Sequence, residues 1–276
     1  MKKRIALVLA IIMVITSLSS MAYAETNTYV DENGNRVFYE CKNMYNTQEI
    51  VELAKAQKGQ RKKAYDIESI ACFDTEDVRF EEIGTVSQLL KVYQDTEGKI
   101  LREYKDTIVY SVVENNTANE ASARTIADKW DSSVSVGMCI GARVLEADYG
   151  RTYGVCGTLT ELDTEYFRED TSVSVTRVSL YEKSYGYTYS NNFSIDHGLV
   201  SKSNYLGYAS NPQEDRRYTN STVGGTLSGN KVHLTARVPG TGYTGGSAVY
   251  TLKRGTNTWS GNIQIKMFLN EDDFIE

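Results

Sequence analysis

Hydrophobic and polar residues alternate along most of the second half of the chain. The alternation is clearest at 134–140, 232–238 and 263–267. It is also present at 173–180, where the phase changes half-way along and predicts a β-bulge. Asn, Gly and Ser residues separate these segments. Short alternating strands spaced by about ten residues predict an antiparallel β-sandwich or barrel.

Two similar turns, 31–34 and 95–98, punctuate the first part of the chain. Each begins with Asp, ends with Gly and is flanked by short apolar segments. Glycine supplies the left-handed backbone that such turns need, so both turns predict β-hairpins. Because Asp-x-x-Gly is a common turn, a duplicated hairpin and two unrelated turns both remain open. Neither turn has the alternating oxygen ligands, closed by Glu, that a calcium loop needs.

One helix is expected in the same part, beginning near Thr47. Apolar residues cluster at 50–54, and basic residues follow between 55 and 63. Cations in and beyond the last turn complement the helix dipole and face water. We therefore interpret them as a solvated helix end rather than as a nucleic-acid site.

Composition changes near Trp130, and the change indicates two parts. Seventeen of the twenty-one glycines follow this residue, and Ser, Thr and Tyr also become more frequent. The polar stretch before it reads as a linker, so the predicted organisation is a small α+β region at 25–113, a linker at 114–130 and a β-sandwich domain at 131–276. The predicted fold class is mainly β, with a C-terminal antiparallel β-sandwich preceded by the small α+β region.

The first 24 residues have the order of a secretory signal peptide. A basic start precedes the apolar run Ile5–Leu18, and Ala22 and Ala24 form a small-x-small cleavage site. As a helix, the apolar run spans roughly 21 Å, short of the roughly 30 Å hydrocarbon core, which favours cleavage over a retained membrane anchor. The sequence therefore predicts a signal peptide at 1–24 and a protein released outside the cell or held non-covalently at its surface.

The charge of the mature chain limits the classes of partner that it is expected to bind. Cleavage after Ala24 leaves 27 Lys plus Arg against 36 Asp plus Glu. Negative charge repels phosphate backbones and anionic lipid, so nucleic acid is not a predicted partner. No second hydrophobic segment follows the first, so we expect no stable membrane anchor in the mature chain. The sequence does not indicate an oligomeric state.

The four cysteines divide evenly between the two parts, which favours pairing within each part. The simplest pairing joins Cys41 to Cys72 and Cys139 to Cys156, the second pair across the turn near Gly150. Each bridge would stabilise the fold by roughly 3 to 4 kcal/mol on the chain-entropy model. Four buried free thiols are the alternative. The spacing contains no C-x-x-C, so a zinc site is not predicted.

The search for catalytic chemistry returns no site. His197 and His233 are the two histidines, and their spacing is not that of a metal motif. Asp196 and His197 would point to opposite faces of a strand, so with Ser194 they do not form a triad. The segment 240–245 matches G-x-G-x-x-G, but a strand is expected after it instead of the helix that a dinucleotide site requires. We predict no catalytic residue, metal or cofactor, although a carboxylate pair remains open.

Tyrosine is the most distinctive residue of the second part. Tyr185, Tyr187 and Tyr189 have period two, so they line one face of a strand. Exposed Tyr among small polar residues is typical of recognition surfaces, whereas buried Tyr packs a core. Trp259 has the same two interpretations. We take these four residues as the candidate binding residues.

Two short segments resemble a group of uncharacterised secreted proteins of Gram-positive bacteria. They are Lys129–Val136, followed by a Ser/Thr/Tyr-rich β region, and Thr258–Gly261. The resemblance covers about the second half of the chain. It implies a secreted bacterial protein and no particular site.

The sequence therefore favours a secreted, non-catalytic binding protein whose partner is an extracellular glycan or protein. The alternative is a secreted β-pore-forming or antimicrobial toxin, since the Ser/Thr-rich run Thr171–Tyr189 has the alternation of an amphipathic hairpin. A hydrolase that uses Asp and Glu is a third hypothesis.

Overall fold

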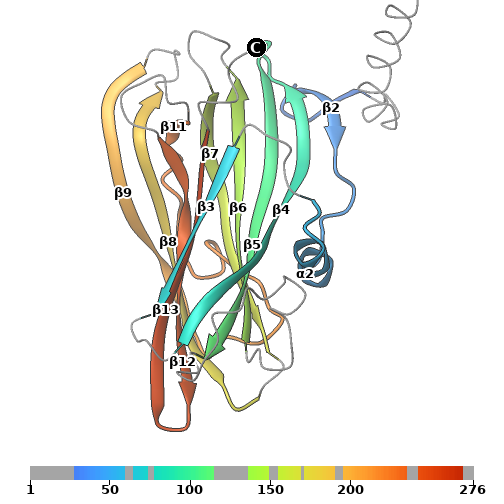
Figure 1. Ribbon diagram of the computed structural model, residues 1–276. Helices are drawn as coiled ribbons and strands as arrows, with labels where there is room; N and C mark the ends of the chain where they lie inside the picture. The colour runs from blue at the N-terminus through green and yellow to red at the C-terminus, as the bar shows by residue number, and fades with distance from the viewer. Residues whose placement is uncertain are drawn as a thin grey trace, which may run out of the picture.

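The computed structural model describes residues 28–59, 65–73, 78–114, 136–148, 155–168, 171–189, 195–234 and 242–269 (Figure 1). Within these ranges the protein is mainly β, which confirms the predicted fold class. The predicted signal peptide lies outside the described residues, and so does the predicted linker from position 115 onward.

Thirteen strands and one helix make up the described chain. Their bounds are β1 Tyr29–Val30, β2 Arg36–Glu40, α2 Thr47–Lys55, β3 Tyr65–Phe73, β4 Val78–Gln94, β5 Ile100–Glu114, β6 Val136–Asp148, β7 Val155–Phe167, β8 Ser174–Tyr189, β9 Ile195–Ser210, β10 Tyr218–Thr219, β11 Lys231–His233, β12 Tyr243–Arg254 and β13 Asn257–Leu269.

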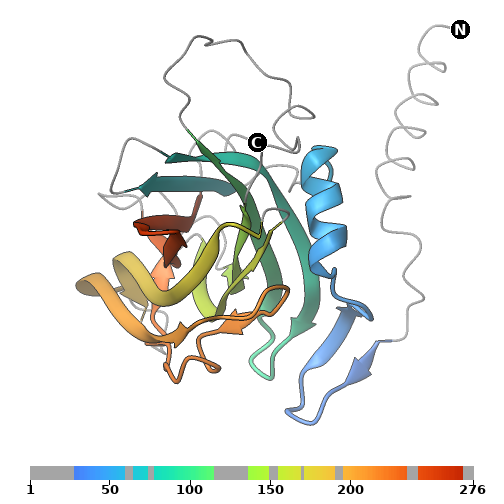
Figure 2. The ribbon, with the colours of Figure 1, turned by 90° about the horizontal axis from the view of Figure 1, so that it is seen from below.

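All described strands pair antiparallel in one sheet, in the order β1-β2-β4-β5-β6-β7-β11-β8-β12-β13-β3, with β10 beside β7 and β9 beside β8. The sheet curls so that its two halves pack against each other in a sandwich-like arrangement, and Figure 2 shows this curl from below. Hydrogen bonds cross the interior: the Tyr250 hydroxyl lies 2.5 Å from Thr164 Oγ1, and Tyr110 donates to the carbonyl of Gln264 at 3.3 Å.

The main core fills the space between the two halves of the sheet. Its members alternate along each strand, as in Met138 and Ile140 on β6 and Ile263 and Ile265 on β13, all fully buried. Leu162 of β7 is also fully buried. It occupies the space above Gly246 of β12, where an added Cβ would lie 2.4 Å from Leu162 Cδ2.

One sheet runs across the predicted division at 114–130. β5 pairs with β6 from Leu101↔Ala147 to Val112↔Val136, and β3 pairs with β13 at the far end of the chain. The two predicted parts therefore share one sheet. Many of the glycines after Trp130 serve tight turns and close approaches, such as Gly246 under Leu162, so the change in composition does not mark a break in the sheet.

Helix α2 begins at Thr47, as predicted. The Asn46 side chain accepts a hydrogen bond from the backbone N–H of Glu49, and the Glu49 side chain accepts one from the backbone N–H of Asn46, which forms a capping box. Ile50 and Ala54 on the helix bury against the outer face of β4 and β5. No helix in the described ranges is long and apolar enough to cross a membrane.

Three local predictions are confirmed. Gly34 and Gly98 adopt φ of +81° and +83°, and both turns close in the same way, with the Asp carboxylate accepting two backbone N–H groups. The bulge in β8 falls at Thr176, because Val175 pairs with Leu252 and Arg177 with Thr251. Strand β12 begins at Tyr243, inside the glycine-rich segment 240–245, and continues to Arg254, so a strand lies where a dinucleotide site would need a helix.

Candidate functional site

The outer face of β8 carries the tyrosines that the sequence places in one row. Leu180 lies in the core, so Tyr185 and Tyr187 lie on the opposite face of the strand, where both are half-buried. The side chain of Tyr189 lies outside the described residues. The row is thus on the outside of the sheet, partly covered by its neighbours.

Neighbouring strands add further tyrosines to this face. On β9, Tyr205 and Tyr208 are 47% and 50% exposed. Tyr205 packs against Tyr181 with ring centroids 5.2 Å apart, and the Arg177 guanidinium lies 4.0 Å from the Tyr208 ring centre. The cation and the paired rings hold these side chains in place on the strand surface.

The same face extends onto β12 and β13. Tyr243 stacks on Tyr185 at 6.0 Å between ring centroids, and Lys266 Nζ lies 5.0 Å from the Tyr243 ring centre. We call this surface the tyrosine face. Its members are Tyr181, Tyr185, Tyr187, Tyr205, Tyr208 and Tyr243.

Trp259 does not belong to the tyrosine face. Its side chain is 9% exposed and packs in the main core. Because it sits in the interior with the apolar residues of β13, we remove it from the candidate binding residues. The ambiguity that the sequence left for this residue is resolved in favour of packing.

The predicted disulfides are not formed. Cys139 pairs in register with Glu165, and Cys156 pairs with Ala147. Eight register steps of about 3.3 Å separate the two cysteines by about 26 Å, whereas a disulfide needs Cα atoms within about 7 Å. The error lies in the register: Cys139 is far from the β6–β7 turn and Cys156 is next to it. Cys41 is also a free thiol, which removes the predicted bridge to Cys72.

The two buried thiols are expected to resist modification in the folded protein. Cys139 and Cys156 are 5% and 2% exposed, and burial raises the pKa of the Cys139 thiol. Treatment of the native protein with iodoacetamide, followed by peptide mass mapping, should modify Cys41 and leave these two unmodified. In urea without reductant, Cys41, Cys139 and Cys156 should all react. A Cys139–Cys156 peptide pair linked by a disulfide would contradict this expectation.

A cavity of about 300 Å³ lies on the outer face of β5, β6 and β7, beside the N-terminus of α2. The sequence did not predict it. Its lining residues are Tyr45, Asn46, Thr47, Ile50, Lys105, Thr107, Cys139, Asp163, Glu165, Asp215 and Arg217. Helix α2 and strand β9 lie at opposite sides of the molecule, so the cavity is remote from the exposed tyrosines of β9 (Figures 1 and 2).

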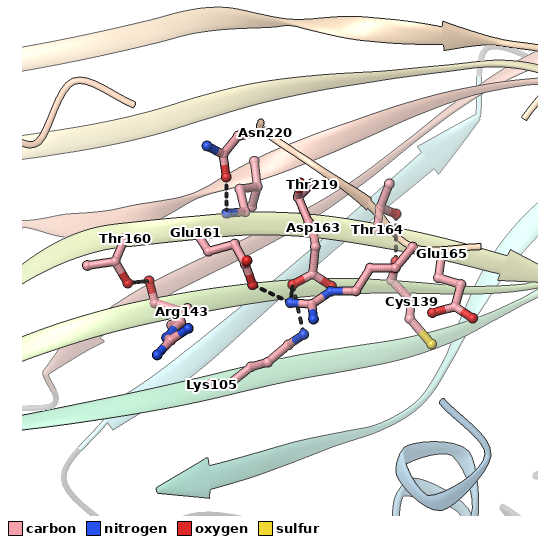
Figure 3. Close-up of polar contacts among 12 residues, drawn as sticks. Lys105, Cys139, Arg143, Thr160, Glu161, Asp163, Thr164, Glu165, Thr219 and Asn220 are labelled. Atoms are coloured by element: carbon pink, nitrogen blue, oxygen red, sulfur yellow. Dashed lines mark hydrogen bonds and ion pairs between the residues drawn. The ribbon is translucent and has the colours of Figure 1, made fainter. Parts of the chain in front are cut away.

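A buried ion pair forms the floor of the cavity. Lys105 Nζ lies 2.8 Å from Asp163 Oδ2, and the two side chains are 8% and 7% exposed. Figure 3 shows Lys105 reaching from β5 towards Asp163 on β7. Gly141 of β6 lies between them, and a Cβ there would come within 2.9 Å of the carboxylate oxygens. The ion pair can therefore form across the middle strand because position 141 has no side chain.

Arg217, which lies on the segment between β9 and β11, adds a second cation to this ion pair. Its Nη2 lies 2.7 Å from Asp163 Oδ2 and also contacts the carboxylate of Glu161. Burial raises the pKa of Asp163, but Lys105 and Arg217 lower it by more, so this pKa lies below its ordinary value. Asp163 is therefore ionised at neutral pH.

The environment of Glu165 raises the pKa of its carboxyl group, the opposite of the effect on Asp163. Glu165 is half-buried, and Thr47 Oγ1, at the first position of α2, donates to its Oε2 at 2.6 Å. Burial is the main cause that raises the pKa of Glu165, and the nearby charges of Asp163 and Asp215 raise it further. The cavity thus holds two carboxyl groups, at i and i+2 on β7, whose proton affinities are pushed apart.

The segment that carries Arg217 and Asp215 is tied to the sheet. The Tyr166 hydroxyl donates to the carbonyl of Pro212 at 2.7 Å, and the N–H of Asp215 donates to the carbonyl of Tyr166 at 3.0 Å. Tyr218 Oη accepts from the N–H of Gln213 at 2.6 Å. The walls of the cavity are therefore preformed.

Part of this site could have been found in the sequence. Asp163 and Glu165 alternate with the buried residues Leu162, Thr164 and Tyr166, which is a strand with two carboxylates on its outer face. Their cationic partners come from distant positions with no spacing rule. The histidines singled out in the sequence lie on β9 and β11, and their side chains are outside the described residues. Within the described ranges, no three His, Cys, Asp or Glu side chains are grouped to hold a metal ion.

Comparisons with protein-family models, with curated proteins and with solved structures found no match. The resemblance to secreted Gram-positive proteins therefore stays an expectation. Of the residues that carry it, Thr258–Gly261 lie on β13, whereas Lys129 to position 135 lie outside the described residues.

Proposed function

We propose that the protein is a secreted, non-catalytic binding protein whose tyrosine face binds an extracellular glycan. The observation that carries the proposal is the gathering of six tyrosines from three adjacent strands on one outward face, with Tyr205 and Tyr208 about half exposed. Tyrosine rings offer rigid apolar area to the C–H face of a sugar, and their hydroxyls hydrogen-bond its polar edge. An antiparallel sheet supplies a firm support for such contacts.

The charge of the tyrosine face favours an acidic glycan. The Arg177 guanidinium lies against the Tyr208 ring, although the whole chain has a net charge of −6. Over the described stretches 177–187 of β8 and 199–208 of β9, the residues that face outward include no carboxylate. A cation among the rings attracts carboxylate or sulfate groups, and this contribution weakens with added salt.

The pore-forming alternative has no comparable support. An inserted hairpin needs one uninterrupted apolar face. On β8 the inner face carries Glu182, which accepts hydrogen bonds from the backbone and side chain of Ser228, and the outer face carries Lys183. Placing either face in hydrocarbon would bury a charge, so we favour binding.

The test uses the mature protein and acidic and neutral polysaccharides. Binding to polygalacturonate and to dextran is measured by affinity electrophoresis and calorimetry at low and high salt. We expect binding to polygalacturonate, weakened by salt. The double variant Tyr205→Ala with Tyr208→Ala should bind at least about fivefold more weakly, because each aromatic contact contributes about 0.5 to 1.5 kcal/mol.

The matched control removes two exposed tyrosines at another edge of the sheet. Tyr29 on β1 and Tyr39 on β2 are 43% and 37% exposed, so Tyr29→Ala with Tyr39→Ala changes a similar area and should leave binding unchanged. Equal losses in the two double variants, or wild-type protein that binds no polysaccharide, would rule out the tyrosine face as a glycan site. Binding to a protein partner alone would count against the glycan in the same way.

A further inference from the structure

The cavity beside α2 carries a second inference, independent of the tyrosine face. We propose that this cavity binds a small hydroxylated ligand through a primary ammonium group, the chemistry of an amino sugar. The ammonium lies between the carboxylates of Glu165 and Asp215, and the hydroxyl groups face the floor of the cavity.

The charged side chains on the floor of the cavity balance one another. Lys105 and Arg217 are its two cations, and Asp163 and Glu161 are their counter-charges, through the ion pairs described above. These four groups neutralise one another. The floor therefore has no net charge to offer an ionic ligand.

The remaining charges at the cavity are both negative. Glu165 makes its one side-chain hydrogen bond, within the described chain, with the neutral hydroxyl of Thr47. Asp215 is exposed at the rim, and its side chain has no hydrogen bond or ion pair with any described residue. The charge of Asp215 contributes to the raised pKa of Glu165, and a ligand cation between the two carboxylates would relieve that repulsion.

An unsatisfied donor in the wall is a separate indication of a polar ligand. Arg217 lines the cavity, and its buried Nε has no hydrogen-bond partner among the described residues. Buried polar groups are normally paired, so this group is left for a ligand or for water. Lys105 Nζ has three N–H donors and directs one towards Asp163, which leaves donors for ligand hydroxyl oxygens.

The volume of the cavity agrees with one sugar ring. A volume of about 300 Å³ is at the small end of ligand pockets, which fits one ring and excludes a chain of several. Tyr45, which is 40% exposed, lines the cavity and offers its ring for stacking or for a cation–π contact.

Ligand binding should be linked to proton release. The groups that face Glu165 come from every element packed around it: Thr47 on α2, Lys105 on β5, Cys139 on β6, Asp163 on β7, and Asp215 and Arg217 on the segment after β9. An ammonium group favours the ionised form of Glu165, so its binding lowers the pKa of that carboxyl and displaces a proton. The ligand should therefore bind more tightly at pH 7 than at pH 5.

The experiment is calorimetry of D-glucosamine with the mature protein, in two amine-free buffers of different protonation enthalpy. D-glucose and N-acetyl-D-glucosamine, which lack the ammonium group, are the comparison ligands. We expect glucosamine to bind at least tenfold more tightly than either and to release protons near pH 5. Glu165→Gln should weaken binding at least tenfold and abolish proton release, and Asp215→Asn should weaken it at least fivefold.

The control variant is Glu97→Gln, a neutralised glutamate that is 68% exposed in the β4–β5 turn. It should bind glucosamine like the wild type, and so should the Tyr205→Ala, Tyr208→Ala variant, which separates this site from the tyrosine face. Equal binding of glucose and glucosamine overturns the proposal. So does no binding of glucosamine, or glucosamine binding that is unchanged in folded Glu165→Gln and Asp215→Asn proteins.

Discussion

Replacing Asp163 by Ala is expected to lower the free energy of unfolding by about 3 to 5 kcal/mol. The substitution leaves Lys105, whose side chain is 8% exposed, as a buried charge without its counter-ion. Arg217 is one-third exposed, so it can turn to solvent and adds less. Urea unfolding followed by tryptophan fluorescence measures the loss.

The control for this variant removes both charges of the buried pair. Lys105→Met with Asp163→Leu replaces the ion pair by apolar side chains of similar size, and most of the lost stability should return. A loss below about 1 kcal/mol in Asp163→Ala would mean that Lys105 is hydrated in the folded protein. The double variant distinguishes an unpaired charge from a simple loss of packing.

Acid provides a second control, because the ion pair keeps the pKa of Asp163 below its ordinary value of about 3.9. A carboxyl whose pKa is lowered by folding stabilises the protein above its unfolded-state pKa, and this contribution disappears as the pH falls through the folded-state pKa. The stability difference between wild type and Asp163→Ala should thus be full near pH 6 and shrink below about pH 4. A difference that does not change with pH would contradict the ionic origin.

Leu162→Ala is expected to lower the free energy of unfolding by about 4 kcal/mol, near the upper end of the range for a buried leucine. Leu162 is fully buried and fills the space above Gly246, where the backbone of β12 is held by pairing with both β8 and β13. The surrounding sheet has little freedom to close the cavity, so most of the lost volume should remain empty. Thermal and urea unfolding measure the effect.

The same substitution at an exposed leucine is the matched control. Leu199 on β9 is 57% exposed, and Leu199→Ala should change stability by less than about 0.5 kcal/mol. If the two variants lost similar stability, the space above Gly246 would have to collapse around the smaller side chain. A crystal structure of Leu162→Ala would then show the shift of β12 directly.

The strands of the sandwich were predictable because each has one apolar face. The described part of the alternation at 134–140 lies in β6, and the alternation at 263–267 lies in β13. The phase change at 173–180 corresponds to the bulge at Thr176. The start of α2 was predictable too, because Asn46 and Glu49 form a capping box ahead of an apolar cluster. These are local signals, read from neighbouring residues.

Errors arose where the answer depends on residues far apart in the chain. The register of β6 against β7 decides whether Cys139 and Cys156 meet, and it is set by the packing of both strands rather than by the distance of each cysteine from the turn. Pairing of β5 with β6 joins the two predicted parts, and no local feature of either segment reveals the partner.

The cavity could not be predicted for the same reason, because its residues come from distant positions in the chain. Asp163 is placed by β7, Lys105 by β5 and Arg217 by a segment after β9, and they meet over Gly141, a residue whose contribution is its missing side chain. The tyrosine row was predictable because its period lies within one strand. Its additional members on β9 and β12 required the order of strands in the sheet.

The pairing of β3 with β13 has a consequence for the order in which the chain folds. It joins Phe73 to Gly261 and Tyr65 to Leu269, partners about 200 positions apart. Strands β4 to β7 pair in succession, each with the next strand of the chain, whereas β3 can pair only after the last strand has been synthesised. Closure of this pair is expected to be a late step of folding. A chain that stops before Asn257 would leave β3 and β12 with bare edges, ready to join another molecule instead of its own sheet.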